Sequence, residues 1–233
     1  MLVRYAGDNL SATLTSVLDL RPYGVVDLGV FDEEAHRSIR SAGTRVFPEA
    51  DPIRLVEDPV YLGGRLQARH LLRSRDRQLI CALLLDSRGD PYGPVRVRGV
   101  ADEAAASGSS SPLVVRVPLD AASAARVLSP VFRDVAGPIG VCCYNDEVAA
   151  AVVAACQILG RADPRDVGVI GADRTDIGQL LTPRLTTVAT DVPGILMLML
   201  QDLISPGPDV SGASNVSNFD FSEFVAVIPG ETG

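Results

Sequence analysis

The stretch from Gly140 to Asp191, GVCCYNDEVAAAVVAACQILGRADPRDVGVIGADRTDIGQLLTPRLTTVATD, decides the fold. The apolar run Ile139–Tyr144 predicts a strand, and Asp146–Leu159 predicts a helix that Gly160 closes. A second apolar run, Val167–Gly171, predicts the next strand. Strands that are apolar throughout and alternate with helices indicate a parallel sheet that is covered on both faces. The stretch therefore predicts a doubly wound α/β architecture.

The same alternation extends over the rest of the chain. Further strands are expected at Leu2–Ala6, Val25–Phe31, Thr44–Phe47, Leu79–Leu85, Leu113–Val117 and Phe224–Ile228. Helices are expected at Ser11–Leu20, Asp32–Ala42, Arg65–Arg73, Val95–Ser107, Ala121–Asp134 and Pro193–Ile204. Serine, glycine and proline are frequent in Ser205–Asn218, which predicts a loop or linker.

Composition excludes several classes of function. The 233 residues are enough for one large domain or two small ones. The net charge of −8 makes the chain a poor binder of nucleic acid or anionic membranes on its own. All 21 basic residues are arginine, which excludes P-loop nucleotide hydrolysis and Schiff-base chemistry. We expect no signal peptide and no membrane span, hence a cytoplasmic protein without membrane partners.

Neither a catalytic set nor a metal or cofactor motif is found. The G-x-S-x-G, H-E-x-x-H and G-x-G-x-x-G patterns are absent, which favours a protein that is not an enzyme. Both histidines, His36 and His70, lie within predicted helices, where a solvated or half-buried structural role is expected. Four cysteines lie in apolar stretches and predict buried, reduced thiols, adjacent ones facing opposite sides of a strand: Cys81, Cys142, Cys143 and Cys156.

Polar side chains follow three of the predicted strands, where an open α/β sheet binds its ligand. Asp86 comes directly after one strand, with Tyr92 and Arg96 close behind it near the start of the next helix. Asn145 and Asp173 follow two others. Carboxylate, amide and guanidinium groups together suit a polar, hydroxyl-rich ligand, because they offer acceptors, donors and a planar fork.

Each of these positions also has a structural alternative. Asp146 is expected to be the N-cap of its helix rather than a ligand contact. Asn145 and Asp173 could equally make local turn hydrogen bonds. The pair Gly63-Gly64 is not a phosphate loop, and we expect it where a helix begins close to a neighbouring backbone.

The same stretch resembles the lactose/galactose-repressor family of bacterial transcription regulators. The resemblance is carried by Tyr144-Asn145-Asp146 (A-N-D in the family), Leu159-Gly160, Asp166–Asp173 (D-V-S-V-V-G-F-D) and Thr182–Val188 (T-P-x-L-T-T-V). Upstream, Gly63–Leu72 is similar to the family's G-G-R-L-A-T-E-H-L-L, and Arg96–Gly99 to its R-L-x-G. Ala172 stands where the family has an aromatic residue, and Arg174 where it has a second aspartate.

The resemblance implies a fold like that of type I periplasmic binding proteins, with two α/β subdomains joined by crossover strands. A sugar or nucleobase would bind between them, contacted by Arg96, Asn145 and Asp173. Crossovers are expected near Leu85–Ser87, Val188–Asp191 and Ser214–Ser217. The N-terminal subdomain would comprise residues 1–86 and 190–213, and the C-terminal one residues 87–189 and 214–233.

Two functions follow as competing hypotheses. The first is the effector-binding and dimerisation portion of a transcriptional repressor, which would act as a homodimer. It would reach operator DNA through a helix-turn-helix that we do not find in this sequence, and the family's first strand–helix unit is not found either. The alternative is a free-standing solute-binding protein of a transporter, which the absence of a signal peptide disfavours. An enzyme on the same architecture is a third, weaker hypothesis, because no nucleophile–base set is found.

Overall fold

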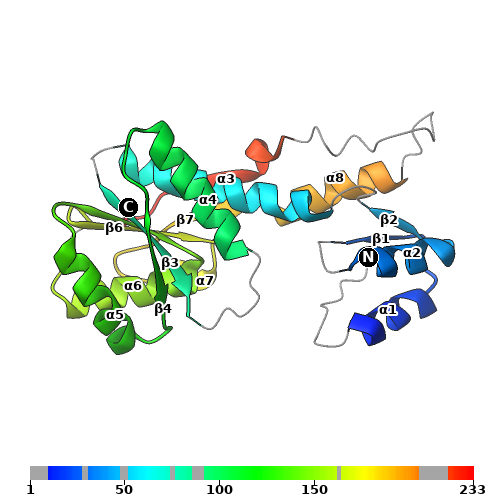
Figure 1. The fold of residues 1–233 in the computed structure, drawn as a ribbon, viewed down its shortest axis with the longest axis horizontal. Coiled ribbons are helices and arrows are strands. Elements are labelled where there is room, and N and C mark those ends of the chain that lie inside the picture. The colour runs from blue at the N-terminus through cyan, green and yellow to red at the C-terminus, as the bar shows by residue number, and fades with distance from the viewer. Residues whose placement is uncertain are drawn as a thin grey trace. The chain divides into compact units, whose positions relative to one another are not determined.

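The computed structural model describes residues 10–27, 31–47, 52–73, 77–85, 92–161, 164–204 and 220–233. The chain divides into two compact units, coloured by residue number in Figure 1. The first unit consists of Met1–Val56 and Val192–Asp220, and the second of Glu57–Asp191 and Phe221–Gly233. Among the described residues, no helix is both long and apolar enough to cross a bilayer.

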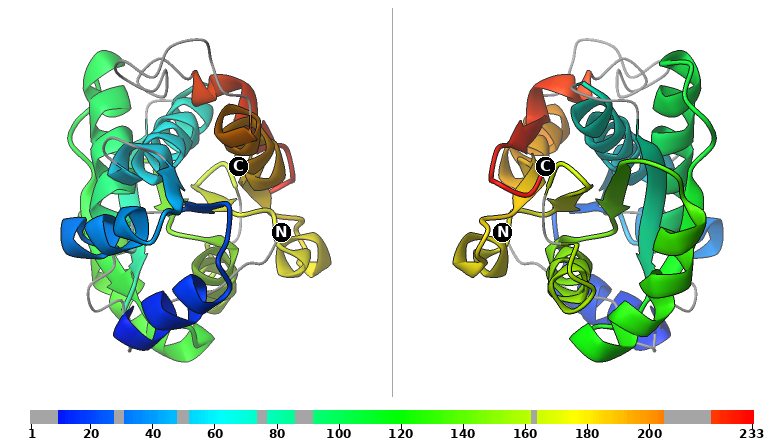
Figure 2. Two further views of the ribbon diagram at one scale, coloured as in Figure 1. Left: turned by 90° about the vertical axis from the view of Figure 1, so that its right-hand side faces the viewer. Right: turned by 90° about the vertical axis from the view of Figure 1, so that its left-hand side faces the viewer.

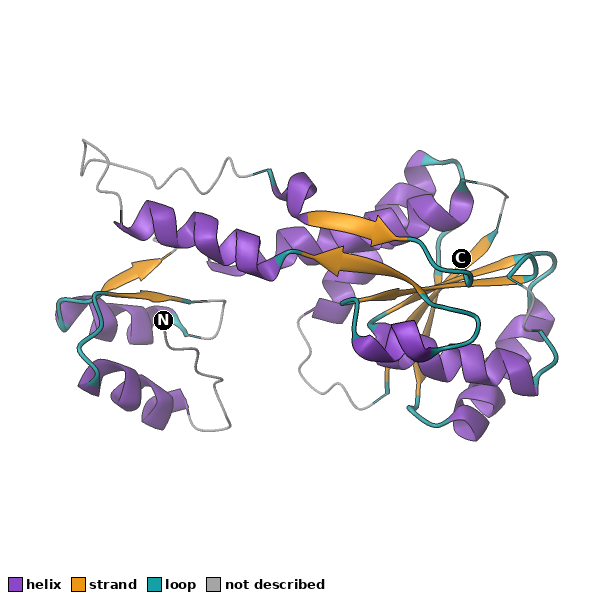
Figure 3. Cartoon of the chain, turned by 180° about the vertical axis from the view of Figure 1, so that it is seen from behind, coloured by secondary structure: helices purple, strands orange, loops and turns teal. Residues whose placement is uncertain are grey.

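The second unit is built on a six-stranded sheet with the order β4-β3-β5-β6-β7-β8. Neighbouring strands are parallel except β7 and β8, which run in opposite directions, as Figure 3 shows. The strand bounds are β3 Gln78–Leu84, β4 Leu113–Val117, β5 Ile139–Cys143, β6 Val167–Ala172, β7 Thr186–Thr190 and β8 Val225–Ile228. The predicted α/β class with a mostly parallel sheet is confirmed.

Both faces of the central strands are buried, which is why these strands are continuous apolar runs. Every residue of β5 and β6 is buried. Cys142 belongs to one hydrophobic cluster and Cys143 to the other, so the two thiols face opposite sides of the sheet, as predicted. All four cysteines are free and buried, and burial raises the pKa of the Cys81 and Cys156 thiols to about 12.

Two helices cover each face of the sheet. The helices α5 (Ala121–Asp134) and α6 (Asp146–Ile158) pack on the face of Cys143, whereas α3 (Pro52–Leu72) and α4 (Tyr92–Ala106) pack on the face of Cys142. The short helix α7 (Asp176–Leu180) follows β6, and a 3-10 turn, Phe221–Phe224, leads into β8.

The helices α3 and α4 lie side by side and approach unusually closely (Figure 2). A Cβ on Gly64 would overlap the Arg96 carbonyl oxygen, and one on Gly99 would overlap that of Tyr61. Glycine allows the two backbones to touch, as expected for the Gly63-Gly64 pair. The expectation that a helix begins at this pair is wrong, because α3 already begins at Pro52.

The first unit holds a smaller α/β arrangement. Its parallel pair is β1 (Gly24–Val26) with β2 (Arg45–Phe47), and its helices are α1 (Leu10–Asp19), α2 (Glu33–Ser41) and α8 (Val192–Ile204). The predicted strand Val25–Phe31 is shorter, since β1 ends at Val26 and residues 28–30 lie outside the described part. The predicted strand Leu2–Ala6 and most of the predicted loop Ser205–Asn218 lie outside it as well.

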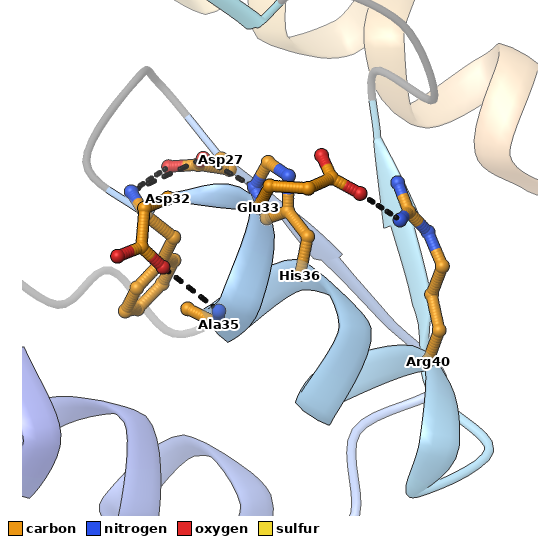
Figure 4. Close-up of polar contacts among 7 residues, drawn as sticks. Asp27, Asp32, Glu33, Ala35, His36 and Arg40 are labelled. Carbon is orange, nitrogen blue, oxygen red and sulfur yellow. Dashed lines mark hydrogen bonds and ion pairs between the residues drawn. The ribbon is translucent and has the colours of Figure 1, made fainter.

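A buried histidine–carboxylate pair supports the end of β1 (Figure 4). Nε2 of His36 lies 2.7 Å from Oδ2 of Asp27, and both side chains are almost fully buried. The Phe31 amide donates to the same carboxylate, and Asp32 caps α2 by accepting from the Ala35 amide at 2.9 Å. The role of His36 is therefore structural, as predicted, but its burial is complete rather than partial. His70 is half-buried on α3, as expected.

The first division of the chain differs from the predicted one. Residues 57–86 were expected in the N-terminal subdomain, yet they belong to the second unit. The physical reason is that β3 pairs with both β4 and β5 and thereby completes the larger sheet. The other divisions fall at 191/192 and 220/221, where boundaries at 189/190 and 213/214 were expected.

Candidate functional site

Two candidate ligand residues lie at the same edge of the larger sheet. The parallel strands β5 and β6 end side by side, and Asn145 and Asp173 follow them. Tyr92 is the first residue of α4 and is partly exposed, and Arg96 lies one turn further along that helix. Asp86 lies outside the described residues.

Arg96 and Asp173 are linked electrostatically. The Arg96 side chain is buried, with 8% of the residue exposed, and its Nη1 lies 3.1 Å from the position a Cβ on Gly63 would occupy. Its positive charge acts on the thiols of Cys81 and Cys142 and on the Asp173 carboxyl. The guanidinium therefore lies on the α3–α4 side of the sheet, within electrostatic range of Asp173.

The backbone at Asp173 takes a conformation that few side chains adopt. Its φ is 90° and that of Arg174 is 49°, both in the left-handed region. The Asp173 amide donates to the Val188 carbonyl at 2.9 Å, which ties this turn to β7. Partial desolvation raises the pKa of the exposed Asp173 carboxyl, Arg96 opposes that rise, and Asp146 and Glu147 add to it.

Asn145 takes the capping role that the sequence predicted for Asp146. The Asn145 side chain is the N-cap of α6, where Oδ1 accepts from the Val148 amide at 2.9 Å. The assignment of the cap to Asp146 is therefore wrong. Since the side-chain oxygen of Asn145 accepts the capping hydrogen bond, its NH2 group is what it can offer to a ligand.

Asp146 instead forms a buried polar network that shapes the turn after β6. Its Oδ1 accepts from the Thr187 hydroxyl at 2.6 Å, and its Oδ2 accepts from the Thr175 amide at 2.7 Å and hydroxyl at 3.1 Å. A side chain at Gly171 would overlap Oδ1, so glycine at this position makes room for the carboxylate. The network fixes Thr175 two residues after Asp173 and thereby holds the turn that carries this residue.

Sequence reasoning missed Gln67 on α3. Its Nε2 donates to the carbonyl oxygens of Cys143 at 2.8 Å and Gly171 at 2.9 Å, and a longer contact of 3.4 Å reaches Ile170. The residue is fully buried. A polar side chain four residues before the buried Leu71 was the signal in the sequence, because both lie on the same face of the helix.

The side chains at this edge carry hydrogen-bond donors and acceptors. A guanidinium, a carboxylate and an amide offer complementary hydrogen bonds to a hydroxyl-rich molecule. Burial raises the pKa of the neighbouring Cys142 and Cys143 thiols well above the ordinary range, so they are not activated nucleophiles. The part of the chain that the structure describes contains no cluster of three or more potential metal ligands.

Comparison with known proteins gives a consistent result. The model of the periplasmic binding protein-like domain matches residues 68–210. Among curated relatives, the probable transcriptional repressor ExuR of Bacillus subtilis is 35% identical over 86 residues, which are 36% of this chain and 26% of ExuR. The transcriptional regulator GntR of Escherichia coli is 32% identical over 130 residues, or 56% of this chain and 33% of GntR.

The solved structures agree on the fold. A LacI family transcriptional regulator from Enterococcus faecium, crystallised with bound ribose, superimposes with a TM-score of 0.65. It is 16% identical in sequence, and the match covers 95% of this chain and 83% of that one. The chain therefore spans no more than about a third of ExuR and GntR but most of this crystallised regulator.

Proposed function

This chain belongs to the periplasmic binding protein-like domain family, and from that premise we propose that it is the effector-binding part of a LacI-type transcriptional repressor. The observation that carries the proposal is the location of Arg96 and Asp173 near the carboxyl edge of the larger sheet, where the charge of the buried Arg96 side chain acts on the Asp173 carboxyl. Such edges are where open α/β sheets bind ligands. The curated relatives ExuR and GntR are a repressor and a regulator of transcription, which favours this function over a transporter's solute-binding protein.

A sugar is the proposed effector. The carboxylate of Asp173 can accept two hydroxyl hydrogen bonds, and Arg96 can donate a pair to neighbouring oxygens. The ribose bound to the Enterococcus faecium regulator supports this class of ligand. Nucleobases remain the second candidate class, since they too offer donors and acceptors in one plane.

Regulation would follow from the two-unit organisation. A ligand that binds one arrangement of the units more tightly than another shifts the equilibrium between them. We propose that the whole protein is a cytoplasmic homodimer without catalytic activity, whose operator DNA is contacted by a helix-turn-helix outside this sequence. The net charge of −8 supports a DNA contact made elsewhere.

The test is a thermal-shift and calorimetric screen of the purified chain against pentoses, hexoses, disaccharides, phosphosugars and purines. A ligand at one hundred times its Kd stabilises the folded state by about 2.7 kcal/mol. Asp173→Ala is expected to abolish the shift, because it removes the acceptor carboxylate. Asp134→Ala, which removes an exposed carboxylate at the end of α5, is expected to leave it unchanged. A cooperative melt that no compound shifts would overturn the proposal.

A further inference from the structure

Gln67 lies in the gap where β5 and β6 separate. The two strands pair in register as far as Cys142 and Ile170. Beyond that point, the carbonyls of Cys143 and Gly171 both accept from Nε2 of Gln67, which enters from the α3 face of the sheet. On the other face, the Asp146 carboxylate lies against Gly171. Two polar side chains, Gln67 on one face and Asp146 on the other, therefore lie at the strand ends that precede Asn145 and Asp173.

The side-chain oxygen of Gln67 is unpaired within the described part of the protein. Its Oε1 is buried and has no hydrogen-bond partner among the described residues, although Nε2 of the same amide makes three contacts. A buried acceptor without a donor is unfavourable, and such atoms are uncommon in folded proteins.

The position of Gln67 relates this atom to the candidate site. Gly63 precedes it by four residues and so lies on the same face of α3. At Gly63, the nearest side-chain atoms are Nη1 of Arg96 and a methyl group of Val188, the residue whose carbonyl accepts from the Asp173 amide. Gln67 on α3 and the guanidinium of Arg96 on α4 thus lie on the same side of the sheet, near the strand ends that carry Asn145 and Asp173.

We propose that Oε1 of Gln67 accepts a hydrogen bond from one hydroxyl group of the bound sugar, directly or through one ordered water. Gln67 is then a specificity-determining residue. It adds a neutral acceptor to the fork of Arg96 and the carboxylate of Asp173, so it favours a hydroxyl donor over a carbonyl or carboxylate oxygen at this point. The inference rests on the proposed function, because it names a contact within the same site.

The test compares one hydroxyl group at a time. Calorimetric Kd values are measured for D-ribose, D-glucose and D-galactose, and for the monodeoxy analogues of each sugar that binds. For the wild type, removal of one particular hydroxyl is expected to weaken binding at least about tenfold, because a buried acceptor is then left unpaired. For Gln67→Met, which preserves the length of the side chain, the same analogue is expected to bind within about twofold of its parent.

The matched control is Gln157→Met on α6, where the glutamine is exposed and reaches only the Thr182 carbonyl. It is expected to retain the tenfold discrimination. If Gln67→Met does not fold, Gln67→Asn replaces it, since the shorter side chain withdraws the amide by one methylene. A purely structural role would weaken parent and analogue equally, and an unchanged ratio for every analogue would overturn the inference. Failure of the wild type to bind any of these sugars would instead overturn the proposed sugar effector, and this inference with it.

Discussion

Asp146 shows how a single buried carboxylate controls the geometry of a neighbouring turn. Both of its oxygens accept hydrogen bonds from groups that belong to other elements, namely Thr175 after β6 and Thr187 in β7. The left-handed backbone at Asp173 and Arg174 directly precedes Thr175. Because such a conformation is costly for side chains other than glycine, it persists only where surrounding contacts fix it. We attribute that role to Asp146.

Replacement of Asp146 is expected to cost more stability than its position after a strand would suggest. Asp146→Ala leaves the Thr175 amide and two hydroxyl groups without their acceptor, and should reduce the free energy of unfolding by about 2–4 kcal/mol. Asp146→Asn keeps one oxygen and should cost about 1 kcal/mol. Glu147→Ala, an exposed change in the same turn, should cost no more than about 1 kcal/mol. Urea denaturation measures all three, and equal values for Asp146→Ala and Glu147→Ala would contradict this account.

Residue patterns along the chain could identify candidate ligand residues but not the hydrogen bonds that each of them makes. The order strand, polar residue, helix was sufficient to single out Asn145 and Asp173. Which of Asn145 and Asp146 caps α6 depends on Thr175 and Thr187, which are about 30 and 40 residues away in the sequence. Likewise, no residue next to Gln67 in the sequence indicates that its amide reaches the ends of two strands.

At the scale of elements, a close backbone contact in the second unit joins α3 to α4. Gly64 and Gly99 place no side chain at the point of contact, and Glu103 follows one turn after Gly99 on α4. The Glu103 carboxylate accepts hydrogen bonds from Nε of Arg65 at 2.9 Å and from Nε of Arg69 at 2.7 Å, both on α3. These arginines lower the pKa of Glu103. The contact thus combines close backbone packing with charge-assisted hydrogen bonds.

A single methyl group at Gly99 is expected to force the two helices apart. Gly99→Ala places a Cβ against the Tyr61 carbonyl oxygen, and we expect a loss of about 2–3 kcal/mol despite the better helix propensity of alanine. Gly108→Ala, just beyond the end of α4, meets no atom within 4 Å but carries a φ of 71°, and should cost only about 1 kcal/mol. Thermal denaturation of both variants measures which one loses more stability. A larger loss for Gly108→Ala than for Gly99→Ala would show that backbone strain matters more than helix packing.

The elements themselves were largely predictable because their apolar patterns are local. Strands β3 to β8 were all anticipated within a few residues, apart from β7, which was expected only as a crossover segment at Val188–Asp191. The assignment of β3 to a unit was not predictable in the same way. A buried run such as Leu79–Leu85 fits either sheet, and only its pairing with β4 and β5 decides the matter.

For the whole molecule, the two units differ in the size of the sheet and of the hydrophobic core that stabilise them. The second unit has a six-stranded sheet with a hydrophobic cluster on each face, and its C-terminal residues complete it. There, Thr232 bridges β6 and β7, since its hydroxyl donates to the Val169 carbonyl at 2.7 Å and accepts from the Thr186 amide at 2.9 Å. Among its described residues, the first unit has two strands of three residues each.

The amides of the two units should therefore exchange with solvent at different rates. A two-stranded sheet is marginally stable alone, whereas buried central strands open only in the least frequent, most global fluctuations. In hydrogen-exchange mass spectrometry of the intact chain, peptides from β3, β5 and β6 should exchange roughly a hundredfold more slowly than those from β1 and β2. A sugar that binds at the strand ends should additionally slow exchange at residues 144–146 and 173–175. Equal protection of β1 and β5 would show instead that the units open as one, in which case the first unit takes its stability from the second.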